Sequence, residues 1–239
     1  MFSSIKQYLQ NIGVPVSAKL DREQFSQNFF QNLEESEWQP HPLYNVFTQY
    51  DQEWYLAQED AFRHKYQCFY AVSKTISPKR IIELGACAGA SGDAYLSAAP
   101  EAKFIGLDVF GVNVRHDDGT PWDPHKIAVQ LFTARGFKKW KFIKKWKLIR
   151  ADLRKLDKLP ARADFVVVDA AHDFDNEYAD LRLALTAKPT FIFVDDADDE
   201  NGAKPAIEKF LQEDLAGRLD YTFPVNYVGG GLVIKLKNS

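Results

Sequence analysis

The sequence predicts an α/β fold: a doubly wound, mostly parallel sheet of seven strands with one antiparallel strand, preceded by a helical N-terminal segment. Three observations lead to this prediction. After Pro78, short apolar runs alternate with longer amphipathic stretches. The first apolar run leads directly into glycines and alanines. The length of 239 residues fits one such domain with an added segment.

Strands and helices are expected to alternate through most of the chain. The regular alternation is typical of a parallel sheet covered by helices on both faces. The last two runs flank Gly229–Gly231, so they are predicted to form a hairpin that makes one strand antiparallel. The predicted strands are Arg80–Leu84, Phe104–Leu107, Lys147–Arg150, Phe165–Val168, Phe191–Val194, Tyr221–Tyr227 and Leu232–Leu236, and the helices between the first five include Ser91–Ala99, Lys126–Arg135 and Asn176–Thr186.

The first 78 residues contain no convincing strand. Ala57–Ile76 has a mixed apolar pattern that is closest to helical, and the prolines and aromatic residues of Glu37–Tyr44 indicate a loop between helices. We therefore expect a helical cap or lid over residues 1–78 and the α/β domain over residues 79–239.

Composition and charge narrow the classes of partner. The chain is 46% hydrophobic and 26% charged, with a net charge of -3, which argues against a globally basic nucleic-acid binder and favours small molecules. It shows neither a signal-peptide pattern nor a run of about 18 apolar residues, and its two cysteines fit a reducing compartment. We expect a cytoplasmic protein with no membrane partner; a homodimer stays open.

The glycine-containing segment Ile81–Ser91 is a strand that runs through small residues into a helix. Glycines let the backbone approach a ligand, and the first N–H groups of the helix attract negative charge, so a nucleotide is expected here. The spacing is not that of the dinucleotide fingerprint, because Cys87 stands where its second glycine would be, and NAD is disfavoured. A tight turn without a ligand is the alternative.

Two strand-end acids are candidates for holding the rest of a nucleotide. Asp108 ends the next predicted strand, about twenty residues beyond the loop, where a carboxylate accepts from both hydroxyls of a ribose. A solvated aspartate in a turn is the alternative. Asp152 follows the third strand and is weaker evidence, because aspartate also caps helices.

A second acidic group is expected where the next two parallel strands end. Asp169 ends one strand, and Asp195 and Asp196 end the next, so their carboxylates should converge and repel one another unless a cation such as Mg²⁺ or Ca²⁺ neutralises them. His172 follows Asp169 closely, and a histidine accepts a proton near neutral pH. A surface histidine beside a solvated acidic loop, such as Asp198–Glu200, is the alternative.

The segment Glu83-Leu84-Gly85-Ala86-x-x-Gly89-x-Ser91 resembles motif I of class I S-adenosylmethionine-dependent methyltransferases, most closely the catechol O-methyltransferase type. The resemblance implies a Rossmann-like fold. It also implies that S-adenosylmethionine is the cofactor, with its methionine part surrounded by the residues of this loop and its adenine beside Asp152. The cofactor-binding residues implied are Glu83, Gly85, Ala86, Gly89, Ser91, Asp108, Asp152 and Asp169.

The acidic group extends this resemblance. In metal-dependent O-methyltransferases, a strand-end aspartate and a following Asp-Asn pair hold Mg²⁺, and Asp169 and Asp195 match these positions. Asp196 departs from the usual asparagine, although related sugar O-methyltransferases have an Asp-Asp pair. His172 stands where catechol enzymes have a lysine and is similar to the histidine that acts as the base in macrolide-sugar enzymes.

The expected function is thus Mg²⁺-dependent O-methylation of a small-molecule acceptor, with Asp169, Asp195 and Asp196 as metal ligands and His172 as general base. A phenol, a sugar hydroxyl and a carboxylate stay open as acceptors. One alternative is an RNA-modifying methyltransferase that uses the basic and aromatic stretch Lys138–Arg150, and another is a non-catalytic protein that binds S-adenosylmethionine. Aromatic residues of the N-terminal segment are expected to close the acceptor pocket: Tyr44, Phe47, Tyr50, Trp54 and Tyr55.

Overall fold

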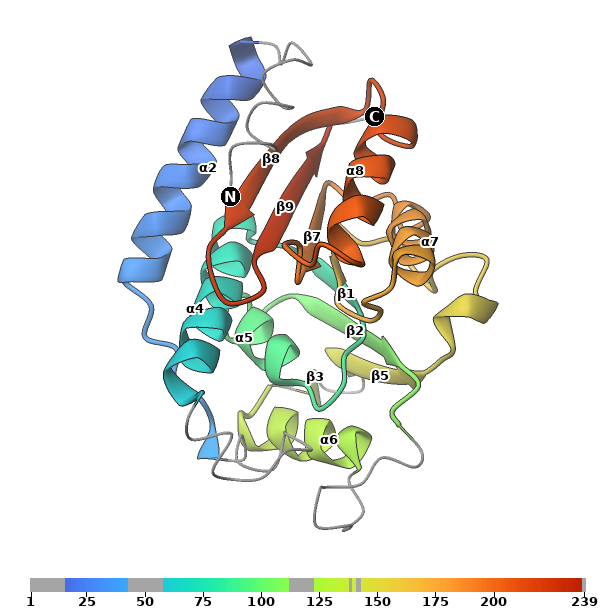
Figure 1. The fold of residues 1–239 in the computed structure, drawn as a ribbon. Helices are drawn as coiled ribbons and strands as arrows, with labels where there is room; N and C mark the ends of the chain where they lie inside the picture. The colour runs from blue at the N-terminus through green and yellow to red at the C-terminus, as the bar shows by residue number, and fades with distance from the viewer. Residues whose placement is uncertain (1–15, 43–57, 112–122, 138, 141–142, 238–239) are drawn as a thin grey trace.

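The computed structural model describes residues 16–42, 58–111, 123–137, 139–140 and 143–237. A seven-stranded sheet crosses the molecule in the order β5-β2-β1-β6-β7-β9-β8, with helices on both faces (Figure 1). Its strands are β1 (Arg80–Leu84), β2 (Lys103–Asp108), β5 (Trp146–Arg150), β6 (Phe165–Val168), β7 (Phe191–Asp195), β8 (Leu219–Val225) and β9 (Gly231–Leu236). The helices are α2 (Val16–Glu34), α4 (Glu59–Ile76), α5 (Ala90–Ala98), α6 (Pro124–Ala134), α7 (Phe174–Leu185) and α8 (Ala203–Glu213).

The first five strands of the sheet, from β5 to β7, are parallel, as the alternation of strands and helices predicts. All four residues of β6 are buried. Strands that are covered on both faces need apolar side chains at every position, which explains the continuous runs in the sequence. The predicted α/β fold with a mostly parallel seven-stranded sheet is confirmed.

The C-terminal hairpin of β8 and β9 is confirmed as well, and its order in the sheet is a finding of the structure. The last strand, β9, lies between β7 and β8 and is antiparallel to both. Gly229 and Gly230 have positive φ angles of 93° and 69° in the turn before it, a conformation that glycine adopts without strain. The turn therefore returns the chain into the sheet beside β7.

Side chains of successive strand residues enter two different cores. Ile81 of β1 packs with residues of α2, α4, α5 and α6, whereas Ile82 packs with residues of α7 and α8. This alternation follows from the two-residue period of a strand. The two helical layers appear on opposite sides of the sheet in Figure 1.

The N-terminal helices belong to the first of these cores. Phe69 of α4 is fully buried, and its ring lies 5.4 Å from that of Tyr95 and 5.3 Å from that of Phe193. Phe25 and Phe29 of α2 pack against Phe223 of β8, with ring centroids 5.2 Å apart in both pairs. The sequence pattern therefore changes at Pro78 because the secondary structure changes there, while residues before and after Pro78 share one hydrophobic core.

Two elements of the structure differ from the sequence prediction, and one predicted group of residues is not described. The helix α8 was not singled out by the sequence, although it covers one face of the sheet. The start of the basic stretch forms a small hairpin of β3 (Lys139–Trp140) and β4 (Ile143–Lys144), where a helix end was expected. The aromatic residues expected to close the acceptor pocket, Tyr44, Phe47, Tyr50, Trp54 and Tyr55, lie outside the described residues.

Among the helices that the structure describes, none has both the length and the apolar character needed to cross a membrane.

Candidate functional site

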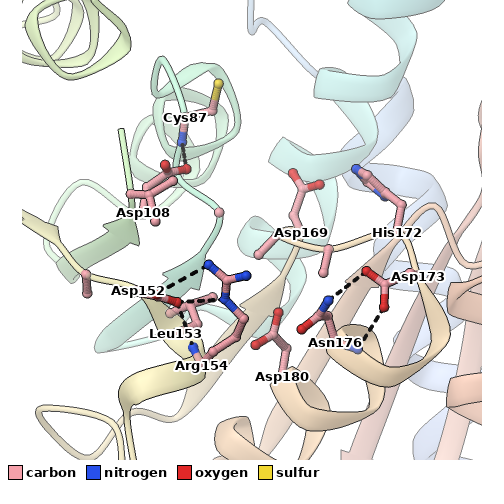
Figure 2. Close-up of a pocket in the computed structure, with 15 residues that line it drawn as sticks. Cys87, Asp108, Asp152, Leu153, Arg154, Asp169, His172, Asp173, Asn176 and Asp180 are labelled. Atoms are coloured by element: carbon pink, nitrogen blue, oxygen red, sulfur yellow. Dashed lines mark hydrogen bonds and ion pairs between the residues drawn. The ribbon is translucent and has the colours of Figure 1, made fainter. Parts of the chain in front are cut away.

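A cavity of about 660 Å³ opens where the parallel strands β1, β2, β5 and β6 end. Ligands of doubly wound sheets bind at this edge, because the strand order reverses there and leaves a crevice. The lining includes Gly85 after β1, Asp108 at the end of β2, Asp152 after β5, and Asp169 and His172 after β6. Figure 2 shows Asp108 and Asp152 on one side of this cavity and Asp169 and His172 on the other.

The backbone of the glycine loop passes very close to the end of β6. Gly85 has a φ of 90°, and a Cβ atom added to it would lie 1.9 Å from the carbonyl oxygen of Asp169. The backbone N–H of Gly85 donates to Leu107 O at 2.8 Å, and the N–H of Asp169 donates to Leu84 O at 2.9 Å. Only glycine fits here, so this residue lets the loop and the acidic strand end meet in one cavity.

Asp108 connects the glycine loop to the end of β2. Its carboxylate accepts from the backbone N–H of Cys87 at 2.8 Å and from that of Phe110 at 2.5 Å. A carboxylate has about four lone-pair sites, so it retains acceptor capacity for a diol. The geometry agrees with the role predicted for Asp108 as a ribose ligand.

Asp152 lies at the opposite end of this side of the cavity and is engaged by its own neighbours. It accepts from the backbone N–H of Arg154 at 3.2 Å, at the start of a short 3₁₀ helix (Leu153–Lys155), and pairs with the guanidinium at 2.9 Å. These interactions with Arg154 lower the pKa of Asp152. Asp180 of α7 lines the same region, and burial raises its pKa to about 6. Asp152, which was predicted from the sequence, and Asp180, which was not, thus both lie near the predicted adenine side.

Four of the implied cofactor residues lie behind the loop and do not line the cavity. Glu83 is fully buried, and this burial raises its pKa to about 8, with a smaller opposing effect from the Ser91 hydroxyl. Ala86, Gly89 and Ser91 are buried beside it. Their contact with the methionine part of a cofactor stays a prediction; in the structure they form the packed support of the loop.

The three acids predicted to hold a metal ion do come together. Asp169, Asp195 and Asp196 each offer one carboxylate oxygen, and these oxygens lie within 4.8 Å of one another; we call this group the acidic cluster. Asp195 is almost fully buried, and its Oδ1 accepts from the Asp196 N–H at 2.9 Å and from the Tyr227 hydroxyl at 2.6 Å. The carboxyl ends of β6 and β7 are neighbours, which explains the convergence.

The sequence reasoning missed the cation that lies in this cluster. Lys65 of α4 places its Nζ 2.6 Å from Asp195 Oδ2 and 3.8 Å from Asp196 Oδ1. Burial alone would lower the pKa of Lys65, but the three carboxylates outweigh it and raise the pKa well above its ordinary value. A signal was available: Lys65 precedes Phe69 and Val72 by four and seven residues, on the apolar stripe of the helix.

The position of Lys65 decides how well the acidic cluster fits a magnesium ion. The oxygens are close enough to share one ion, and Mg²⁺ requires oxygen ligands at about 2.0–2.1 Å. The Lys65 ammonium, however, already lies close to both Asp195 and Asp196. Two cations at this distance would repel each other strongly. With Lys65 in this place, the residues do not fit a divalent ion.

His172 lies at the mouth of the cavity. Its side chain is 60% exposed, and its Nδ1 is 3.6 Å from Asp196 Oδ2. A smaller cavity of about 350 Å³ beside it is lined by Asp196, Asp198 and Asp199. The backbone of Gly202 approaches so closely that a Cβ there would lie 1.7 Å from the His172 carbonyl oxygen. The histidine is therefore held by its backbone while the imidazole stays accessible.

Two side chains of the basic stretch on which the RNA alternative depends, Lys145 and Trp146, make contacts within the protein. Trp146 is buried, and its ring lies 5.4 Å from that of Phe132. Lys145 forms an ion pair with Glu101 on the surface. Trp146 is thus a core anchor of β5.

Comparison with known proteins gives matches at the level of structure. No family model matches the chain, and no curated protein sequence is similar enough to indicate a relative. The SAH-bound methyltransferase PaMTH1 of Podospora anserina has 17% identity and a TM-score of 0.58 over 90% of this chain and 96% of that chain. The O-methyltransferase TomG of Streptomyces achromogenes, in complex with SAM, has 16% identity and a TM-score of 0.55 over 91% and 99%.

A putative O-methyltransferase of Klebsiella pneumoniae has 15% identity and a TM-score of 0.55, again over 91% of this chain and 99% of that chain. These similarities extend over 90–91% of this chain and 96–99% of the other chains. The chain therefore has the fold of class I S-adenosylmethionine-dependent methyltransferases.

Proposed function

We propose that this protein is an S-adenosylmethionine-dependent methyltransferase that methylates an oxygen of a small-molecule acceptor, with His172 as the general base. The observation that carries the proposal is that one cavity is lined by the glycine loop and Asp108 on one side and by Asp169 and His172 on the other. A cofactor subsite and a proton acceptor thus face the same space.

The cofactor subsite fits S-adenosylmethionine by its chemistry. The carboxylate of Asp108 lines the cavity and retains acceptor capacity for the two hydroxyls of a ribose. The similar structures of PaMTH1 and TomG are described with SAH and SAM, which supports the same ligand here. When bound, this cofactor supplies an electrophilic methyl group on a sulfonium.

His172 is suited to take the acceptor proton. The imidazole is exposed at the cavity mouth, and its Nδ1 lies 3.6 Å from Asp196, so the carboxylate favours an orientation in which Nε2 is free for the acceptor. Asp196 also stabilises the imidazolium that forms when the proton is taken. Most of the remaining catalysis is expected from positioning of the acceptor.

The magnesium ion that the resemblance implies on Asp169, Asp195 and Asp196 is not part of this proposal. Its binding would require the ammonium of Lys65 to leave Asp195, where it lies 2.6 Å away. We therefore assign no step of the reaction to a metal ion.

The first experiment is calorimetric titration of S-adenosylmethionine into the purified protein, with NAD as control and with Mg²⁺ present or chelated. We expect saturable binding of S-adenosylmethionine alone, with a micromolar dissociation constant. A screen of phenols, sugars and carboxylic acids, read out as S-adenosylhomocysteine release, then identifies the acceptor class. Absence of binding under every condition would overturn the proposal, and binding without turnover of any acceptor would favour a non-catalytic role.

A further inference from the structure

A buried ion pair joins two elements that are far apart in the sequence. Lys65 comes from α4, and Asp195 ends β7, yet their charged atoms lie 2.6 Å apart. The Asp195 side chain is 1% exposed and that of Lys65 is 18% exposed. Charged side chains are rarely buried unless each is paired with an opposite charge, so Lys65 and Asp195 neutralise each other.

We propose that Lys65 is the resident cation of the acidic cluster, so that Asp169, Asp195 and Asp196 are compensated without a divalent metal ion. The proposal concerns which cation the cluster holds, and it rests on the proposed function only where turnover is measured. It assigns Lys65 as a positioning residue, because it acts on the site through Asp195 and Asp196.

The bonds of Asp195 support this assignment. Its Oδ1 already accepts two hydrogen bonds, from the Asp196 N–H and the Tyr227 hydroxyl, and its Oδ2 faces the ammonium. One lone-pair site of Oδ2 is left beside the ammonium, so a divalent ion bound to it would lie next to the Lys65 charge and be repelled by it. Displacing the ammonium instead would leave a largely buried lysine charge without its partner, which is unfavourable.

The ammonium of Lys65 also lies near two aromatic rings. It lies 5.6 Å from the ring centroid of Phe69 and 5.6 Å from that of Tyr227. Phe69 is one helical turn after Lys65 on the buried face of α4. These cation–π contacts favour a single position of the flexible side chain and oppose its displacement by a metal ion.

The test is titration of Mn²⁺ into the 239-residue protein, with binding measured as the loss of the free-ion electron paramagnetic resonance signal. Wild type is expected to show no saturable binding below about millimolar concentration, whereas Lys65→Met should bind at least about tenfold more tightly, because the emptied acidic cluster then attracts the ion. Lys65→Arg keeps the positive charge and should behave as wild type.

The chain offers a matched control. Lys235 lies 2.9 Å from Asp21 and 3.0 Å from Asp220, and its side chain is 17% exposed, so it pairs with two acids at nearly the same exposure as Lys65. Lys235→Met should gain no Mn²⁺ site. If Lys65→Met fails to fold, Lys65→Gln removes the same charge with a smaller change of polarity and serves in its place.

Two results would overturn the inference: wild type that already binds Mn²⁺ saturably below about millimolar concentration, or Lys65→Met that binds Mn²⁺ no better than wild type. Once an acceptor is known, wild-type turnover should persist in excess EDTA, and loss of turnover that Mg²⁺ restores would also contradict it. Failure to bind S-adenosylmethionine would instead refute the proposed function and leave the Mn²⁺ result valid.

Discussion

The two sides of the cavity are built in different ways. On the cofactor side, Gly85 and Cys87 lie in the loop after β1 and Asp108 ends β2; the backbone N–H of Gly85 donates to Leu107 O, and that of Cys87 donates to the Asp108 carboxylate. The other side, which we call the acceptor side, is lined by His172 and by Asp169 of the acidic cluster, and within this cluster the charged side chains of Lys65 from α4 and Asp195 from β7 make the contact. The first side depends on local backbone geometry, and the second depends on charge balance between distant elements.

The largest effect is expected from a substitution at Gly85, where the glycine loop contacts the end of β6. Gly85→Ala places a Cβ 1.9 Å from the Asp169 carbonyl oxygen at a φ of 90°. The loop or the end of β6 must then move, and we expect a loss of stability of about 4 kcal/mol or more, together with loss of S-adenosylmethionine binding. Denaturant unfolding and calorimetry measure the two effects.

Gly217→Ala is the control for this substitution. Gly217 has a φ of 76°, but a Cβ there would meet no atom within 4 Å. It should cost only the strain of the left-handed conformation, about 1–2 kcal/mol, and leave cofactor binding intact. Equal effects of the two substitutions would show that conformation alone matters and that the contact with Asp169 does not.

The next effect concerns chemistry on the acceptor side. His172→Ala should lower turnover by about 10² or more while the affinity for S-adenosylmethionine stays unchanged, because the exposed imidazole supports no buried contact of the loop. His41→Ala, outside the cavity lining, is the control. Steady-state kinetics after acceptor identification measures the effect, and unchanged turnover of the His172 variant would remove its role as base.

A smaller effect is expected from the cofactor side. Asp108→Asn puts an amide NH₂ against the N–H of Cys87 or Phe110, so one charge-assisted hydrogen bond becomes a repulsive contact. We expect S-adenosylmethionine affinity to fall by about tenfold or more. Asp152→Asn should have less effect, because Asp152 already pairs with Arg154 near the surface. Calorimetric titration compares them, and a larger loss for Asp152→Asn would reverse their predicted roles.

The last effect concerns stability. It tests whether the buried carboxyl group of Glu177 destabilises the folded protein when it ionises. Glu177 of α7 is 2% exposed, and burial raises its pKa from 4.5 to about 8. The folded protein therefore holds this proton more tightly than the unfolded chain, so the contribution of Glu177 to stability is full below pH 4.5 and is lost as pH rises to 8.

Glu177→Gln removes this dependence because the amide is neutral throughout. At pH 8, we expect the variant to be more stable than wild type by at least about 1 kcal/mol, which corresponds to at least about 2–4 °C in melting temperature, and to gain much less at pH 5. Thermal unfolding at both pH values measures it. The exposed Glu208→Gln is the control, and an equal gain at pH 5 would mean that packing rather than charge is responsible.

Much of the cofactor side could be predicted from the sequence, because its features are local. The run Ile81–Leu84 and the small residues after it specify a buried strand and a close backbone approach within a few positions. Asp108 and Asp169 were predicted as site residues because each directly follows an apolar run that forms a strand. The antiparallel strand was expected from Gly229–Gly231, but its place between β7 and β8 was not, since pairing in a sheet is decided by long-range packing.

The sequence by itself determined the sheet of alternating strands and helices, the glycine loop and the acids at the strand ends, because periodicity and turn chemistry act between near neighbours. The tertiary structure alone decided that Lys65 lies among the acids, that Glu83 and Ser91 lie behind the loop, and that α2 and α4 share one core with the sheet. The physical reason is that a charge or a ring finds its partner through space, and the fold brings Lys65 and Asp195 together across 130 positions of the chain.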